Sequence, residues 1–149
     1  MMKTWLFTWN PRLWAWDNPL TGYHEMRHEV ETAGFSYSKW TCGTNKSIQP
    51  GDRIFLIRLG MEPRGIIASG YAITPVFEGT HWNPEKQAAG RKARRVYIRF
   101  DKILDVGRGI LRMDDLRLIS GTMCWSAQSS GISIPDDITV KLEEYWKAY

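Results

Sequence analysis

Cysteine and histidine are scarce in this chain: 149 residues contain two cysteines and three histidines. Cys42 and Cys124 form no C-x-x-C pair, which argues against a disulfide scaffold and against a four-ligand zinc ribbon. No apolar run approaches the roughly 20 residues that span a bilayer, and the N-terminal apolar stretch is too short for a signal peptide. We therefore expect a cytoplasmic protein with no membrane partner.

The common catalytic and nucleotide-binding motifs are also missing. The sequence has no G-x-S-x-G, no Walker A loop, no G-x-G-x-x-G and no HNH-type nuclease core. One pattern does fit: His24, Glu25 and His28 match H-E-x-x-H, which on a helix could hold zinc with the glutamate as general base. The only other histidine is His81, so no third ligand follows at a known spacing. A solvated helix face is the simpler interpretation, and we expect no metal, no cofactor and no catalytic residue.

Tryptophan and positive charge are what the chain has in excess. Eight tryptophans occur, and 20 Lys and Arg against 16 Asp and Glu give a net charge of +4. Mild basicity with many aromatic rings is typical of proteins that bind anionic, flat-faced ligands such as nucleic acids. A tryptophan-rich core under a slightly basic surface is equally consistent with these numbers. The length is that of one domain, spanning residues 1–149.

Short apolar segments separated by turn residues predict a small, strand-rich fold. The interval 121–134 is rich in Gly and Ser and is expected to be a loop. Two or three short helices and five or six strands favour an α+β, mostly β, partly open barrel. The expected strands are Thr4–Trp9, Phe35–Thr41, Ile54–Leu59, Gly65–Thr74 and Val96–Phe100, and the clearest helices are Tyr23–Ala33 and the segment from Pro135 through Trp146.

The densest charge cluster predicts a contact strip for nucleic-acid phosphates, although a solvated strand entrance explains it as well. Lysine and arginine side chains on such a strip would bind any sequence through the phosphate backbone. The strip comprises Arg91, Lys92, Arg94 and Arg95, with Lys39, Lys46 and Arg64 as candidate extensions.

The tryptophans divide by context. Trp5 and Trp146 fall on apolar faces and are expected in the core. Four others stand at or beyond the ends of expected elements, where large rings are costly to expose unless they line a pocket. Such rings can stack on a base, and an adjacent amide or hydroxyl can bond its edge. The predicted pocket comprises Trp9, Asn10, Trp40, Thr41, Trp82, Trp125 and Ser126. Rim aromatics that simply close a barrel remain an alternative.

Several motifs occur in an order that resembles the EVE domain, a member of the PUA-like superfamily related to YTH. They are W-N-P at 9–11, W-T-C-G at 40–43, G-D-R-I-F-L at 51–56, P-R-G-I-I-A-S-G at 63–70 and W-S-A-Q-S-S-G-I-S-I-P at 125–135. The last is similar to the EVE pattern found beside HNH endonuclease domains. The resemblance covers essentially the whole chain and implies a PUA-like open β-barrel of five to six strands.

The resemblance also implies a function. It indicates a binding domain that flips 5-methylcytosine or 5-hydroxymethylcytosine out of DNA into an aromatic cage, of which Trp40 would form one wall and either Trp82 or Trp125 the other. Such a domain would be the sensor of a modification-dependent restriction system, with nuclease activity supplied by a fused or associated HNH nuclease or McrB-like motor. A reader of N6-methyladenine-like RNA bases, as in YTH, is the main alternative. A zinc hydrolase using His24, Glu25 and His28, or a small-molecule or peptide pocket, is less favoured.

Overall fold

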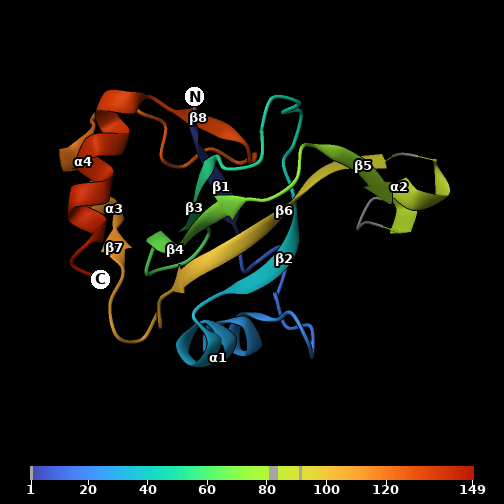
Figure 1. Ribbon diagram of the computed structural model, residues 1–149, viewed down its shortest axis with the longest axis horizontal. Coiled ribbons are helices and arrows are strands. Elements are labelled where there is room, and N and C mark those ends of the chain that lie inside the picture. The colour runs from blue at the N-terminus through green and yellow to red at the C-terminus, as the bar shows by residue number, and fades with distance from the viewer. Residues whose placement is uncertain (1, 81–83, 91) are drawn as a thin grey trace.

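The computed structural model describes residues 2–80, 84–90 and 92–149. Figure 1 shows a strongly curled sheet with helices at two sides and a β5–α2 arm that projects from the body. The strands are β1 (Thr4–Trp9), β2 (Ser36–Thr41), β3 (Arg53–Arg58), β4 (Gly65–Ala72), β5 (Phe77–Thr80), β6 (Lys92–Ile103), β7 (Leu111–Arg112) and β8 (Ile132–Ile134). The helices are α1 (Tyr23–Ala33), α2 (Pro84–Ala88), α3 (Met113–Ile119) and α4 (Asp136–Trp146).

The main sheet runs in the order β2-β6-β4-β3-β1-β8, with β5 added to β6 and β7 added to β4. Among the ladders of the described residues, the β1–β3 pair alone is parallel. Strands β2 and β8 are the two ends of the path, so the barrel is open between them. Loops close this gap: Asn45 Nδ2 donates a 2.8 Å hydrogen bond to the Gly131 carbonyl, and the Ser129 side chain packs on Gly43. We call this junction of residues 43–47 with residues 129–133 the barrel seam.

Alternation along the strands builds two separate apolar layers. Ile54 and Leu56 of β3 face the barrel interior, whereas Phe55 and Ile57 face an outer cluster covered by α3 and α4. Successive side chains point to opposite sides of a sheet, so a strand covered on both sides reads as a continuous apolar run. That is why the expected strand Ile54–Leu59 shows no polar alternation, and the structure confirms a strand there at Arg53–Arg58.

Two of the predicted elements are present at the expected positions. The strand at Thr4–Trp9 and the helix at Tyr23–Ala33 are confirmed at the expected bounds, and Gly34 ends the helix in the left-handed conformation with φ of 89°. The strand expected at Val96–Phe100 is much longer, since β6 begins within the basic run.

The expected number of strands was too low. The described residues form eight strands, and the three that were not expected, β5, β7 and β8, are each four residues or shorter. Asp114 and Asp115 lie in the first turn of α3. The interval expected to be one Gly/Ser loop ends in β8. Short strands carry too little periodicity to be recognised from their own residues.

Candidate nucleic-acid interface

Trp9 and Trp40 lie in the barrel interior and keep only 7% and 4% of their surface exposed. They belong to one aromatic cluster with Trp14, Trp16 and Tyr23, and Trp40 meets Trp14 and Trp16 edge-on at ring-centre distances of 5.1 and 5.0 Å. The Trp9 indole N–H donates to the Trp14 carbonyl at 2.8 Å. The Trp40 indole N–H has no hydrogen-bond partner among the described residues. These rings fill one another's faces, so no open cage stands ready for a base at Trp40.

Trp125 lies on the opposite side of the sheet from Trp40. It is buried in the outer cluster beside α3 and α4, and its indole N–H donates to the Ser120 carbonyl at 3.0 Å. The sheet separates the two rings, so Trp125 cannot form the second wall of a cage with Trp40. The other candidate wall, Trp82, lies outside the described residues.

The three polar neighbours also point to different places. Asn10 Oδ1 accepts the backbone N–H of Arg12 at 3.0 Å, so its acceptor closes a local turn. Thr41 follows the inward Trp40 on β2 and therefore faces outward. Ser126 is exposed beside the buried Trp125. The structure does not gather these side chains around one hollow.

A hollow does exist at the barrel seam. It is a cavity of about 480 Å³ lined by Trp5, by the loop after β2 and by the segment that leads into β8. Ligand pockets commonly measure about 300–1,000 Å³, so a nucleobase is well within its capacity. The loops contribute Thr44, Asn45, Lys46, Ser47, Ser129, Ser130 and Gly131, and β8 contributes Ile132 and Ser133.

The seam cavity offers hydrogen-bonding groups that the fold does not use. Asn45 and Ser130 are occupied: Asn45 Oδ1 accepts from the Ser47 N–H, and Ser130 Oγ accepts from the Thr8 N–H at 3.0 Å. The hydroxyls of Ser129 and Ser133 make no side-chain hydrogen bond with any residue that the structure describes. The cavity therefore combines two fixed polar groups with free donors and acceptors, which suits the edge of a heterocycle.

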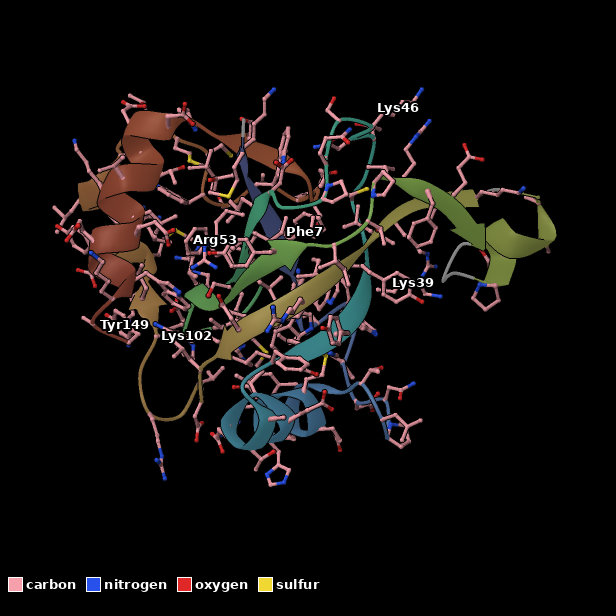
Figure 2. All side chains as sticks on the ribbon, in the orientation of Figure 1. Phe7, Lys39, Lys46, Arg53, Lys102 and Tyr149 are labelled. Carbon is pink, nitrogen blue, oxygen red and sulfur yellow. The ribbon has the colours of Figure 1, made fainter. Side chains whose placement is uncertain are left out.

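Basic side chains border this end of the barrel. Lys46 lines the cavity, and Arg94 lies beside the end of β2, where its carbonyl accepts the Cys42 N–H at 2.9 Å. Figure 2 shows Lys39 and Lys46 on the side from which β5 and α2 project. Lys39 and Arg95 face outward on β2 and β6, and Lys92 is exposed at the start of β6. The predicted strip is thus assembled in part, while Arg91 lies outside the described residues.

Arg64 does not join the strip. Its Nε makes an ion pair with Glu62 Oε1 at 2.9 Å, and its carbonyl accepts the Met113 N–H at the start of α3. Side-chain hydrogen bonds from Arg64 lower the pKa of Glu62, so this pair is ionised at neutral pH. Arg64 belongs to the β4–α3 junction and not to the seam.

Cys42 is buried in the barrel interior at the end of β2. Burial raises the pKa of its thiol, and the nearby Arg94 opposes that rise only in part. A thiol held in its neutral form is a poor nucleophile. Cys42 therefore serves as a small apolar core residue.

A second cavity, of about 350 Å³, lies under α4 around a charged network. Arg53 bridges Asp101 at 3.1 Å and Glu143 at 3.2 Å, and the Trp146 indole donates to Ser69 Oγ at 2.9 Å. Burial opposes the charge on Arg53, but the two carboxylates outweigh it and raise its pKa. The acids and bases here largely satisfy one another, so we assign this network to docking of the C-terminal helix (Figure 2).

The H-E-x-x-H residues lie on the outer surface of α1. His24 and His28 are both exposed, one turn apart. No group of three or more His, Cys, Asp or Glu side chains within the described ranges is arranged to hold a metal ion. The described helices also include none with the length and apolar character needed to cross a membrane.

Solved structures share this architecture. A hypothetical protein from Leishmania major matches with a TM-score of 0.66 and 10% identity over 99% of this chain and 96% of its own. Human THYN1, solved in complex with DNA containing 5-methylcytosine, matches with a TM-score of 0.61 and 10% identity over 96% of each chain. The chain has a PUA-like fold. An ASCH protein from Zymomonas mobilis also matches, at TM-score 0.58 and 13% identity over 95% of this chain and 94% of its own.

No protein-family model matches the chain, and no curated protein matches it either. TM-scores of 0.58–0.66 over nearly complete chains establish the shared fold, and at 10–13% identity the likeness extends to the fold alone.

Sequence reasoning missed the residues that form the seam cavity. Asn45 and Ser129 to Ser133 are spread over two loops, and only the closing of an open sheet brings them together. One signal was available: two polar, small-residue segments follow W-T-C-G and W-S-A-Q. Trp14, which stays 45% exposed against the Trp40 ring edge, was also missed.

Proposed function

We propose that this chain is a nucleic-acid-binding module that reads a modified cytosine in DNA, taking the extruded base into the seam cavity. The observation that carries the proposal is that cavity, with free hydroxyls inside and Lys46 at its edge. Support comes from human THYN1, which shares the fold and was solved with 5-methylcytosine DNA. The binding module would have no catalysis of its own and would serve as the sensor of a modification-dependent restriction system.

The lining of the cavity favours 5-hydroxymethylcytosine over 5-methylcytosine. A buried methyl contributes about 0.8 kcal/mol, roughly a fourfold preference over plain cytosine. A hydroxymethyl group could also bond Ser129 or Ser133, and a net hydrogen bond contributes about 0.5–1.5 kcal/mol. Trp5 presents little ring surface, because it is buried with its indole N–H bonded to Asp52 at 2.8 Å. Selectivity in this site would therefore come from hydrogen bonds more than from stacking.

The free-energy cost of extruding a base has to be offset by contacts outside the cavity. Flipping a paired base costs a few kcal/mol, and phosphate contacts can supply that energy without reading sequence. Lys46 and Arg94 stand at the same end of the barrel as the cavity, and Lys92 lies farther along β6, where it pairs with Thr80 of β5. The phosphates next to a flipped base would meet these side chains.

The direct test is fluorescence anisotropy with labelled duplexes that differ at one central base: cytosine, 5-methylcytosine or 5-hydroxymethylcytosine. We expect affinity to rise in that order. Ser133→Phe should fill the cavity from an exposed position and remove the preference, while Ser126→Phe, an exposed serine outside the cavity, should keep it. Equal affinity for all three duplexes would refute modified-cytosine reading.

A reader of modified RNA bases is the second candidate, because the residues that line the cavity do not by themselves distinguish ribose from deoxyribose. Single-stranded RNA with one N6-methyladenine, tested in the same assay, separates the two. Preference for that RNA over its unmodified form, abolished by Ser133→Phe, would assign the cavity to RNA.

A further inference from the structure

The outer face of strands β2, β6 and β4 carries tyrosines with no covering helix among the described residues. Tyr37, Tyr97 and Tyr71 stay 45%, 40% and 38% exposed. Helices α3 and α4 cover the β3 side of the outer face, and α1 packs through Tyr23 and Met26 against the inner cluster. Among the described residues each ring has one neighbour, namely Phe35 for Tyr37, Phe77 for Tyr97 and the Arg53 guanidinium for Tyr71. Three large rings that still stay more than one-third exposed on adjacent strands need an explanation, since soluble proteins rarely group exposed apolar surface without use.

The strand register arranges these rings with cations in two rows. Tyr37 on β2 is paired with Arg99 on β6, which is paired with Tyr71 on β4. In the next row Lys39 is paired with Tyr97, whose carbonyl accepts the Ile73 N–H. Aromatic and cationic side chains therefore alternate across the sheet and along β2 and β6. We call the surface of Tyr37, Lys39, Tyr71, Tyr97 and Arg99 the tyrosine platform.

Both charged residues of the tyrosine platform, Lys39 and Arg99, are positive. Neither Lys39 nor Arg99 forms an ion pair with any described residue, and the guanidinium carbon of Arg99 lies over the Phe35 ring, 4.5 Å from its centre. The nearest acid along β6 is Asp101, which is bound to Arg53 and Ser69. An exposed surface of π faces and cations matches a polyanion that also carries flat rings.

We propose that the tyrosine platform binds single-stranded nucleic acid, with unpaired bases stacked on the tyrosines and phosphates held by Lys39 and Arg99. Stacking on aromatic side chains tolerates any base sequence, because every base has a π face. A duplex hides those faces, so the platform should prefer single strands. This site is separate from the seam cavity and needs no modified base.

The test is anisotropy with a labelled, unmodified oligothymidine of about 20 nucleotides and with a duplex of equal length. Tyr37→Ala and Tyr97→Ala should each weaken oligothymidine binding about fivefold or more, the loss expected for one stacked base. Tyr97→Phe keeps the ring and should stay within about twofold of the wild type. Tyr145→Ala, on α4 at 42% exposure, is the matched control and should change nothing.

The charges give a second readout. Lys39→Ala should reduce the salt dependence of oligothymidine binding by about 0.7 for each phosphate that the variant no longer neutralises, the slope typical of single strands. Because Tyr97 stacks on Phe77 of β5, circular dichroism should check that Tyr97→Ala keeps the fold. Tyr37 makes its ring contact with Phe35, which lies outside β5. Unchanged oligothymidine affinity in both alanine variants would overturn the proposal.

Two further outcomes are decisive. If the tyrosine variants change the sedimentation of the free protein instead of its oligothymidine affinity, the platform is a contact between two copies of this chain, and the proposal falls. Ser133→Phe should leave oligothymidine binding unchanged, since it fills the other site. A protein that distinguishes modified duplexes but ignores oligothymidine keeps the proposed function and loses only this inference.

Discussion

Replacing Trp40 should show that this ring is first of all a core residue. Trp40 is 4% exposed and packs on Trp14, Trp16 and Phe100, the last at a ring-centre distance of 5.9 Å. Trp40→Ala removes the whole indole from the meeting point of the barrel wall and the 10–22 loop. Trp40→Phe keeps an aromatic ring and loses the indole N–H, which has no partner among the described residues.

The magnitudes separate the two variants. Truncating a buried tryptophan to alanine costs about 3–5 kcal/mol. A domain of this size is stable by about 5–15 kcal/mol, and each kcal/mol moves Tm by roughly 2–4 °C. Trp40→Ala should therefore lower Tm by roughly 6–20 °C. Trp40→Phe sacrifices no hydrogen bond, so its cost is the smaller volume of the ring, about 1–2 kcal/mol.

Urea denaturation followed by far-ultraviolet circular dichroism measures both effects. A cost below about 1 kcal/mol for Trp40→Ala would refute tight packing of this ring and reopen an aromatic site there. Binding assays on Trp40→Ala need a temperature at which the variant is fully folded. If folded Trp40→Ala keeps the preference for modified DNA, Trp40 supports the fold and the base lies elsewhere.

Three other variants test parts of the same architecture. Gly70→Ala should prevent normal β4–β6 pairing, because the added Cβ would collide with the Arg99 carbonyl. We expect loss of soluble protein or a large fall in Tm. A wild-type Tm would contradict the strand register. Arg53→Met should cost about 1–3 kcal/mol in urea denaturation by releasing Asp101 and Glu143, with less effect at high salt; no change would mean that the bridge contributes nothing. Burial raises the pKa of Cys42, so the folded state holds the thiol proton more tightly than the unfolded state does. The free energy of unfolding should therefore fall as pH rises above about 8.5. Cys42→Ala should flatten that fall between about pH 7 and 9.5.

Apolar patterning was enough to place the main strands because their environment is uniform along their length. Leu6, Phe7 and Leu56 are completely buried, and runs of such residues specify a strand covered on both faces. The helix at Tyr23–Ala33 was equally clear, since Gly34 marks its end. What patterning could not reveal is which side of the sheet a ring occupies. Trp40 and Trp125 carry similar local signals, yet one lies inside the barrel and the other beneath α4.

The seam cavity could not be predicted from spacing either. Asn45 meets Gly131 across more than half of the chain, and this contact exists because β2 and β8 are the two unpaired ends of one curled sheet. The basic residues were easier to identify, because charge alone selects them. Even so, composition could not tell that Glu62 neutralises Arg64 while Lys39 has no ion-pair partner among the described residues.

Both proposed surfaces depend on β2, and the strand's geometry explains how one nucleic acid could use both. Trp40 points inward and fixes the strand to the core, while Lys39 and Thr41 point outward along the tyrosine platform. Four residues separate Tyr37 from Thr41, about 13 Å at the rise of a strand. Lys46 and the seam cavity follow in the next loop. In a substrate that is single-stranded beside the modified base, the flanking strand could continue from the cavity along β2 to the platform. Linking two weak sites in this way raises overall affinity through effective concentration, with no tighter contact at either site. A shallow cavity with modest selectivity would then suffice for a useful reader, because the platform would hold the flanking strand while the cavity tests the base.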